Sequence, residues 1–270
     1  MTMPFDLYQL FWFFTVYSFL GWCLEVCFCS INTGKFVNRG FLNGPVCPIY
    51  GFGMAAVLTV LTPVQNNLLA LFFGGMLLAS LLELFGGWAL KKLFHTSWWD
   101  YSDQPFNLGG YICLKFSLAW GLCIVLVMRV IQPAVAAFVR AVTTAGDGIP
   151  GAVLTVLTAV AFLCDLAVTV AAIAKIDRNL GAIEDIARLL HEGSEAVSEK
   201  LGNTALAVDG SVDESLPGLR ARLDLLRAEV VDNRHFVALR LMRAFPRMKH
   251  IRHAEAFEQI RTWLDEKAKK

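Results

Sequence analysis

Residues 68–93 read LLALFFGGMLLASLLELFGGWALKKL, an apolar run with one acid, Glu83, before Lys91 and Lys92. A helix needs about 20 mostly apolar residues to cross about 30 Å of hydrocarbon. The run does not alternate with a period of two residues, which excludes a strand of a transmembrane β-barrel. It therefore predicts a transmembrane helix and an all-α fold, a polytopic helical bundle.

Similar apolar runs recur along the first two thirds of the chain. We predict about five spans in a transmembrane domain of residues 1–176, at residues 5–31, 48–61, 68–93, 114–138 and 152–176. The second is short, and a re-entrant segment is the alternative there. The uncharged segment Thr62–Asn67 joins the second and third spans as a tight turn, which predicts an antiparallel hairpin.

Composition agrees with a membrane protein. Of the 270 residues, 56% are hydrophobic and 17% charged, against about a quarter charged in soluble domains. The net charge of +1 does not indicate a nucleic-acid partner. The seven cysteines form neither a disulfide framework nor a zinc pattern, so we expect no metal and no cofactor.

Lysine and arginine residues are concentrated in one set of connections, which is expected to face the cytoplasm. These residues are Lys35, Arg39, Lys91, Lys92, Lys115, Lys175 and Arg178. The other set carries Arg140 alone. The count places the N-terminus outside, and both long loops and the C-terminus in the cytoplasm.

The tail, residues 177–270, has an ordinary soluble composition and is predicted to be helical and cytoplasmic. We predict helices at residues 181–207 and 219–231, with a linker at 202–217. Residues 234–252 are basic and contain no acid, and Arg240, Arg243, Arg247 and Lys249 are candidates for a membrane-surface helix. A solvated basic face packed on the rest of the tail is the alternative.

The first cytoplasmic loop reads NRGFLNGPVCPIYGFG at residues 38–53. Glycine permits unusual backbone geometry and proline removes hydrogen-bond donors, so such a segment at membrane depth must be buried in protein or line a wet cavity. Helix capping and close helix packing explain the same residues equally well. The residues expected to shape this loop are Gly40, Gly44, Pro45, Pro48, Tyr50 and Gly51.

The second cytoplasmic loop reads HTSWWDYSDQPFNLGGY at residues 95–111. Trp98, Trp99 and Tyr101 suit the membrane–water interface, and Gly110 is expected to shape the turn. The polar residues between them, including Asp100 and Asn107, are an alternative site for a cation, a substrate or a partner loop.

Three acids, Glu25, Glu83 and Asp165, lie inside apolar segments, where ionisable groups are costly and indicate function by default. At 1.5 Å per residue, Glu25 lies on the order of 10 Å, Glu83 roughly 12 Å and Asp165 roughly 16 Å from the cytoplasmic ends of their helices. We hypothesise a cytoplasm-facing polar site with Arg39 as counter-charge; structural ion pairing is the alternative. The candidate residues are Glu25, Arg39, Asn43, Glu83, Asp100, Asn107 and Asp165.

The two loop motifs, with GWCLEV at residues 21–26, resemble the ABC-transporter type IV permease family of small bacterial membrane proteins. The resemblance covers about the first 130 residues; Gly109 departs from it, standing where a polar residue is expected. It implies an inner-membrane location and a separate ATPase subunit. By resemblance, the residues of interest are Glu25, Arg39, Gly40, Asn43, Gly44, Pro45, Pro48, Tyr50, Gly51, Glu83, Trp99, Asp100, Tyr101, Asn107 and Gly110.

Three functions remain open at this point. A transporter component is the first; five spans is few for a permease, so a homo-oligomer is expected. A membrane-embedded enzyme acting on a lipid or lipid-linked substrate is the second, with Arg39 binding phosphate and an acid as base. A non-catalytic interaction protein is the third. The chain contains no nucleotide-binding P-loop and no known hydrolase motif, so we do not expect it to hydrolyse ATP itself, and we favour a non-enzymatic function over an enzyme.

Overall fold

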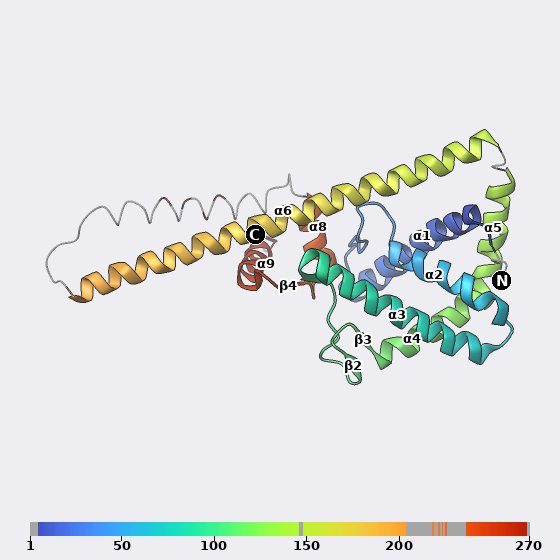
Figure 1. Cartoon of the computed structure of the whole chain (residues 1–270), viewed down its shortest axis with the longest axis horizontal. Helices are drawn as coiled ribbons and strands as arrows, with labels where there is room; N and C mark the ends of the chain where they lie inside the picture. The colour runs from blue at the N-terminus through green and yellow to red at the C-terminus, as the bar shows by residue number, and fades with distance from the viewer. Residues whose placement is uncertain are drawn as a thin grey trace. The chain divides into compact units, whose positions relative to one another are not determined.

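The computed structural model describes residues 5–145, 148–203 and 236–268, together with residues 218, 221, 223 and 225. Helices dominate these residues, as the sequence predicts (Figure 1). The chain divides into two compact units: Met1–Thr169 with Arg243–Met248, and Val170–Met242 with Lys249–Lys270. Most of the predicted linker and the helix predicted at 219–231 fall outside the described residues.

The first unit contains most of the helices. They are α1 (Leu7–Thr33), α2 (Pro48–Leu61), the 3-10 turn η1 (Thr62–Val64), α3 (Leu68–Phe94), α4 (Leu114–Leu126), the π-helical turn η2 (Val127–Ile131), α5 (Gln132–Ala145) and the start of α6 (Ile149–Asn203). Three short strands lie between α3 and α4: β1 (Thr96–Ser97), β2 (Asn107–Leu108) and β3 (Ile112–Cys113).

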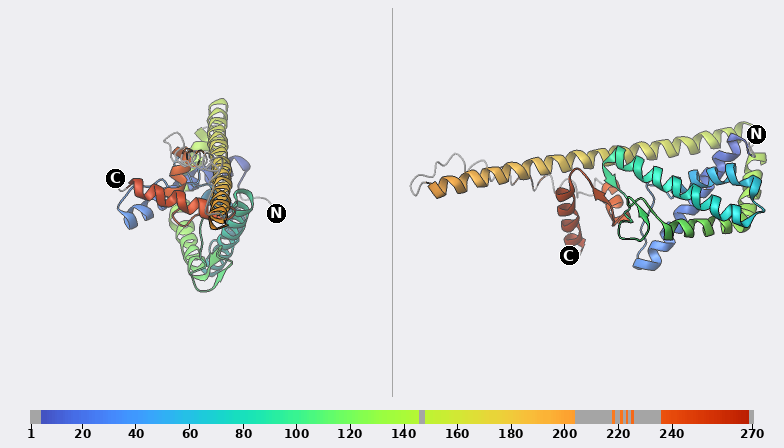
Figure 2. Two further views of the ribbon diagram at one scale, coloured as in Figure 1. Left: turned by 90° about the vertical axis from the view of Figure 1, so that its left-hand side faces the viewer. Right: turned by 60° about the horizontal axis from the view of Figure 1, so that its bottom comes forward.

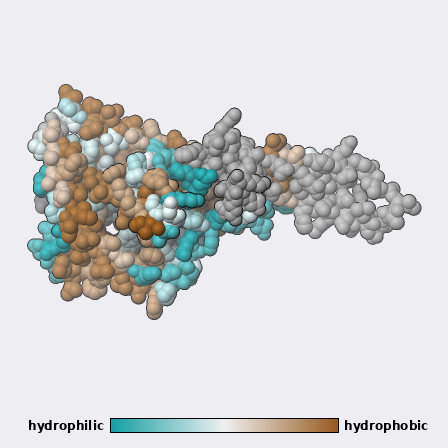
Figure 3. Space-filling view, turned by 180° about the vertical axis from the view of Figure 1, so that it is seen from behind, coloured by the Kyte–Doolittle hydropathy of each residue, from teal (hydrophilic) through white to brown (hydrophobic). Residues whose placement is uncertain are grey.

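Within the described residues, four helical segments are long and apolar enough to cross a membrane. They are Leu7–Thr33, Leu68–Phe94, Leu114–Ala145 and Ile149–Leu189, so the chain is a membrane protein. Helix α2 has 14 residues and a length of about 21 Å, less than the thickness of the hydrocarbon layer. Large apolar side chains cover much of the outer surface of this region, as the brown areas of Figure 3 show.

Local sequence signals set where these helices begin. Asp6 and Gln9 form a capping box at the start of α1, and Asn67 accepts hydrogen bonds from Leu69 and Ala70 at the start of α3. Pro48 occupies the first turn of α2, where its missing N–H costs nothing. The predicted hairpin is present, because η1 and Asn67 turn α2 directly into α3.

Small residues allow the helices to approach closely. A Cβ on Gly51 would lie 2.3 Å from Ser18 Oγ and 2.5 Å from the carbonyl oxygen of Phe14, so α1 and α2 touch almost backbone to backbone. Gly121 of α4 lies against Phe72 of α3 in the same way. Helices α3 and α4 run side by side in both views of Figure 2. Ser80 donates a hydrogen bond to Ser117 across this pair at 2.7 Å.

Helix α6 runs without a break from Ile149 to Asn203, through the span predicted at 152–176 and most of the helix predicted at 181–207. The second unit contains its later part together with α8 (Phe236–Ala244), β4 (Lys249–His250) and α9 (Ala254–Ala268). Leu180, Ile183, Phe257 and Ile260 are buried there. His250 and His253 stack on each other and face Asp177 and Glu184 of α6, respectively.

Candidate functional site at the two loops

The first loop, residues 34–47, runs back along α1 in an irregular conformation. Its last residue, Cys47, donates its N–H to the carbonyl oxygen of Ser18 at 2.8 Å. Ser18 lies 15 residues before the end of α1 at Thr33, a distance of about 22 Å along the helix. Helix α2 therefore begins at the middle of α1, and the loop covers the remaining length.

The irregular backbone of the first loop lacks the hydrogen bonds of a helix, so its polar groups need other partners. Asp165 of α6 supplies them to the centre of the first loop. Its Oδ1 accepts from the N–H and the side-chain amide of Asn43, at 2.9 and 2.8 Å, and its Oδ2 accepts from the N–H of Gly44 at 2.7 Å. Thr169, one turn further along α6, accepts a second bond from the Asn43 amide at 3.2 Å.

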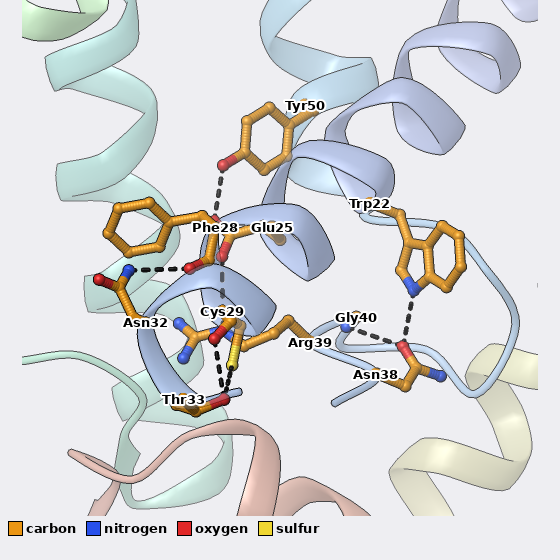
Figure 4. Close-up of polar contacts among 10 residues, drawn as sticks. All are labelled: Trp22, Glu25, Phe28, Cys29, Asn32, Thr33, Asn38, Arg39, Gly40 and Tyr50. Carbon is orange, nitrogen blue, oxygen red and sulfur yellow. Dashed lines mark hydrogen bonds and ion pairs between the residues drawn. The ribbon is translucent and has the colours of Figure 1, made fainter. Parts of the chain in front are cut away.

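Asn38 fixes the beginning of this irregular stretch. Its side-chain oxygen accepts from the indole of Trp22 at 2.7 Å and from the N–H of Gly40 at 3.1 Å, as Figure 4 shows. Its amide donates to the carbonyl oxygen of Asn43 at 2.8 Å. A Cβ on Gly40 would lie 2.8 Å from the carbonyl oxygen of Val46, so the loop folds tightly on itself here.

A second acid, Glu25 of α1, also binds this loop. Arg39 lies 3.4 Å from its Oε2, and Tyr50, at the start of α2, donates its hydroxyl proton to Oε1 at 2.7 Å (Figure 4). Gly21 makes room for the Tyr50 ring, since a Cβ there would lie 2.3 Å from it. One carboxylate therefore binds a cation from the loop and a hydroxyl from the next helix.

The second loop holds its shape through its own hydrogen bonds. The Asp100 side chain accepts from the N–H and hydroxyl of Ser102, and the Asn107 amide donates to the carbonyl oxygens of Gln104 and Ser102. Strands β2 and β3 form a hairpin in which Asn107 pairs with Cys113. Gly110 has a φ of +74°, and a Cβ there would lie 2.7 Å from the Ser102 hydroxyl.

Glu83 of α3 joins the second loop to the helices. It is buried, with 9% of its surface exposed, and its Oε1 accepts from the Tyr101 hydroxyl at 3.0 Å. Burial raises the pKa of that hydroxyl well above its ordinary value, and the charges of Glu83 and Glu25 raise this pKa further. Glu83 therefore anchors the second loop to α3 through Tyr101.

The two loops meet through aromatic rings, and a tail segment packs on them. Phe41 of the first loop contacts Trp98 of the second, edge to face, with ring centroids 5.1 Å apart. Phe245 contacts the same Trp98 at 5.1 Å and lies 5.8 Å from the Arg39 guanidinium. Arg247 lies 3.7 Å from Asp103 and donates to the carbonyl oxygen of Asp100 at 3.4 Å.

The other residues singled out from the sequence differ in their packing and exposure. Trp99 packs on Gly87 and donates to the carbonyl oxygen of Tyr111. Among the basic tail residues, Arg240 is buried, whereas Arg243 and Lys249 are exposed. The sequence did not predict that Trp22, Phe245 and Arg247 contact the loops. Trp22 belongs to the GWCLEV motif, whereas no pattern in the tail sequence indicated that Phe245 and Arg247 pack against the loops.

Comparison with known proteins agrees with the resemblance in the loop motifs. The model of a family described as "Putative ABC-transporter type IV" matches residues 12–170, more than half of the chain. The match covers both loops, Glu25, Glu83 and Asp165. No curated protein and no solved structure matches the chain.

Proposed function

Because the chain belongs to the ABC-transporter type IV family, we propose that it is the membrane-embedded component of an ATP-driven transporter in the bacterial inner membrane. Its N-terminus is outside and its loops and tail are cytoplasmic, as the lysine and arginine distribution favours. A separate ATPase subunit supplies the energy, since the sequence contains no P-loop. A second copy of the chain completes the transport path, because the spans of one chain are few for a permease.

The observation that carries this proposal is a pair of polar contacts to acids of the apolar helices, Glu25 with Arg39 and Tyr50, and Glu83 with Tyr101. Charged groups among membrane helices are costly and mark substrate or ion pathways. Here they sit beside a half-length helix, α2, and an irregular segment, a combination that borders substrate sites in transporters. An enzyme acting on lipid phosphates is less favoured, because Arg39 is bound to Glu25 and stacked on Phe245.

The second loop is the surface we assign to the ATPase subunit. Its turn is rigid, and Phe106 and Leu108 at its tip are 81% and 59% exposed. Phe106 also has a φ of +53°, so the loop holds this ring outward at some conformational cost. Apolar side chains on a fixed turn suit docking to a partner.

Purification of the tagged full-length protein from native membranes in mild detergent tests this assignment. Mass spectrometry should identify a stoichiometric P-loop ATPase that is lost with Phe106→Gly. This substitution removes the aromatic ring and relieves the backbone strain of the positive φ. Phe36→Ala is the matched control, because Phe36 is 71% exposed on the first loop. A preparation without any ATPase, or one in which both variants behave alike, contradicts the assignment.

A further inference from the structure

Glu83 has an incomplete set of partners. Only 9% of its surface is exposed, and its Oε1 accepts from the Tyr101 hydroxyl at 3.0 Å. Its Oε2 is buried and has no hydrogen-bond partner within the described residues. A buried carboxylate oxygen without a partner carries a desolvation cost that is not offset.

The charges around the cluster do not balance. Arg39 lies beside Glu25 at 3.4 Å, but no lysine or arginine among the described residues lies within 4.0 Å of Glu83. Lys91 and Lys115, which are near in sequence to the cluster, lie over the rings of Tyr111 and Phe116. Glu25 therefore has a cationic partner, whereas Glu83 has none among the described residues.

The two tyrosines of the cluster each pack against another aromatic ring. Tyr101 stacks on Phe116 with ring centroids 4.8 Å apart, and Tyr50 meets Trp120 edge to face at 5.8 Å. A carboxylate among tyrosine and tryptophan faces is the environment that attracts organic ammonium groups, through charge and through cation–π contacts. A metal ion suits it less, since the described residues contain no cluster of three acidic, histidine or cysteine ligands.

We propose that Glu83, with Tyr50, Tyr101 and Trp120, binds the ammonium group of an organic cation, which is the class of substrate that this protein carries. The assignment of the ligand as substrate rests on the proposed transport function. The ammonium group meets Glu83 Oε2 and the aromatic faces, while Glu25 stays bound to Arg39 and Tyr50. The first loop, which carries Arg39, and the second loop, which carries Tyr101, border the site together.

Isothermal titration calorimetry on the full-length protein in detergent tests the site, with benzyltrimethylammonium as the probe and benzyl alcohol as its uncharged counterpart. Wild-type protein should bind the cation saturably and should not bind the alcohol. Glu83→Gln keeps the size and the acceptor for Tyr101 but removes the charge, and it should weaken binding at least ~10-fold, which corresponds to about 1.4 kcal/mol.

Asp103→Asn is the matched control, because it removes the same charge from an exposed acid of the second loop and should leave binding unchanged. Trp120→Leu provides a second variant, should Glu83→Gln fail to fold, and should also weaken binding. Absence of saturable cation binding by the wild type overturns the site, as does equal binding by wild type, Glu83→Gln and Trp120→Leu. Because this assay needs no ATPase, cation binding without a co-purifying ATPase keeps the site and rejects the transporter.

Discussion

The two loops reach a fixed shape in opposite ways. The first loop is held by side chains from other helices, with Trp22 of α1 and Asp165 of α6 binding Asn38, Asn43 and Gly44. The second loop also has contacts with Glu83 and Arg247, but many of its hydrogen bonds join its own residues over two to five positions of sequence. The conformation of the first loop therefore depends on the positions of α1 and α6, whereas that of the second depends more on contacts within the loop.

The largest effect is expected at Asp165. Asp165→Ala leaves two backbone N–H groups without their acceptor and removes one of the two acceptors of the Asn43 amide, and should cost about 3 kcal/mol of unfolding free energy. Unfolding by SDS in mixed micelles measures this. Asp165→Asn keeps one acceptor and should cost less. Equal stability of the alanine variant and the wild type would show that the first loop does not depend on α6.

A smaller loss is expected at Gly110. Gly110→Ala puts a methyl group at positive φ and against Ser102 and Asp100, and should cost about 2 kcal/mol through strain and overpacking. Gly34→Ala is the control, because Gly34 has a similar φ of +68° with no atom within 4 Å of the added Cβ. The difference between the two variants measures crowding in the second loop, and a difference of zero would mean that the loop is not tightly packed.

The Trp22 indole contributes a single hydrogen bond to the first loop. Trp22→Phe keeps an aromatic ring and removes the donor to Asn38, and should cost about 1 kcal/mol. Proteolysis of the first loop in mixed micelles should become faster, while that of the second loop should not change. Faster cleavage in both loops would show that the two are not independently supported.

The smallest effect is expected at Arg247. Its side chain and that of Asp103 are 61% and 59% exposed, and exposed ion pairs contribute little. Arg247→Ala should change the unfolding free energy by about 0.5 kcal/mol or less, and the effect should disappear at high salt. A loss of several kcal/mol would assign the tail segment a larger part in holding the second loop.

Local signals explain what the sequence could predict. The apolar runs predict where the transmembrane helices lie, and Pro48 and Asn67 determine where α2 and α3 begin. The extent of α6 could not be predicted from hydropathy, because a helix continues wherever helix-forming residues follow, whether or not they are apolar. The short α2 was visible from the sequence, but its start at the level of Ser18 was not.

The candidate site was predicted as a set of residues rather than as contacts. Glu25 and Glu83 stood out because charges are rare in apolar segments. Their partners could not be predicted, since Tyr50 is 25 residues from Glu25, and Asp165 is 122 residues from Asn43. Asp165 was expected beside the other acids, and in the structure its bonds are to the first loop and Thr169.

Labelling from either side of the membrane tests the central claim, that the two loops form one cytoplasmic face. Phe36→Cys and Phe106→Cys place thiols at exposed positions of the first and second loop, in a chain lacking the exposed Cys27, Cys123 and Cys164. A membrane-impermeant maleimide should label both positions in inverted membrane vesicles and neither in intact cells. Labelling of either position in intact cells would contradict the account.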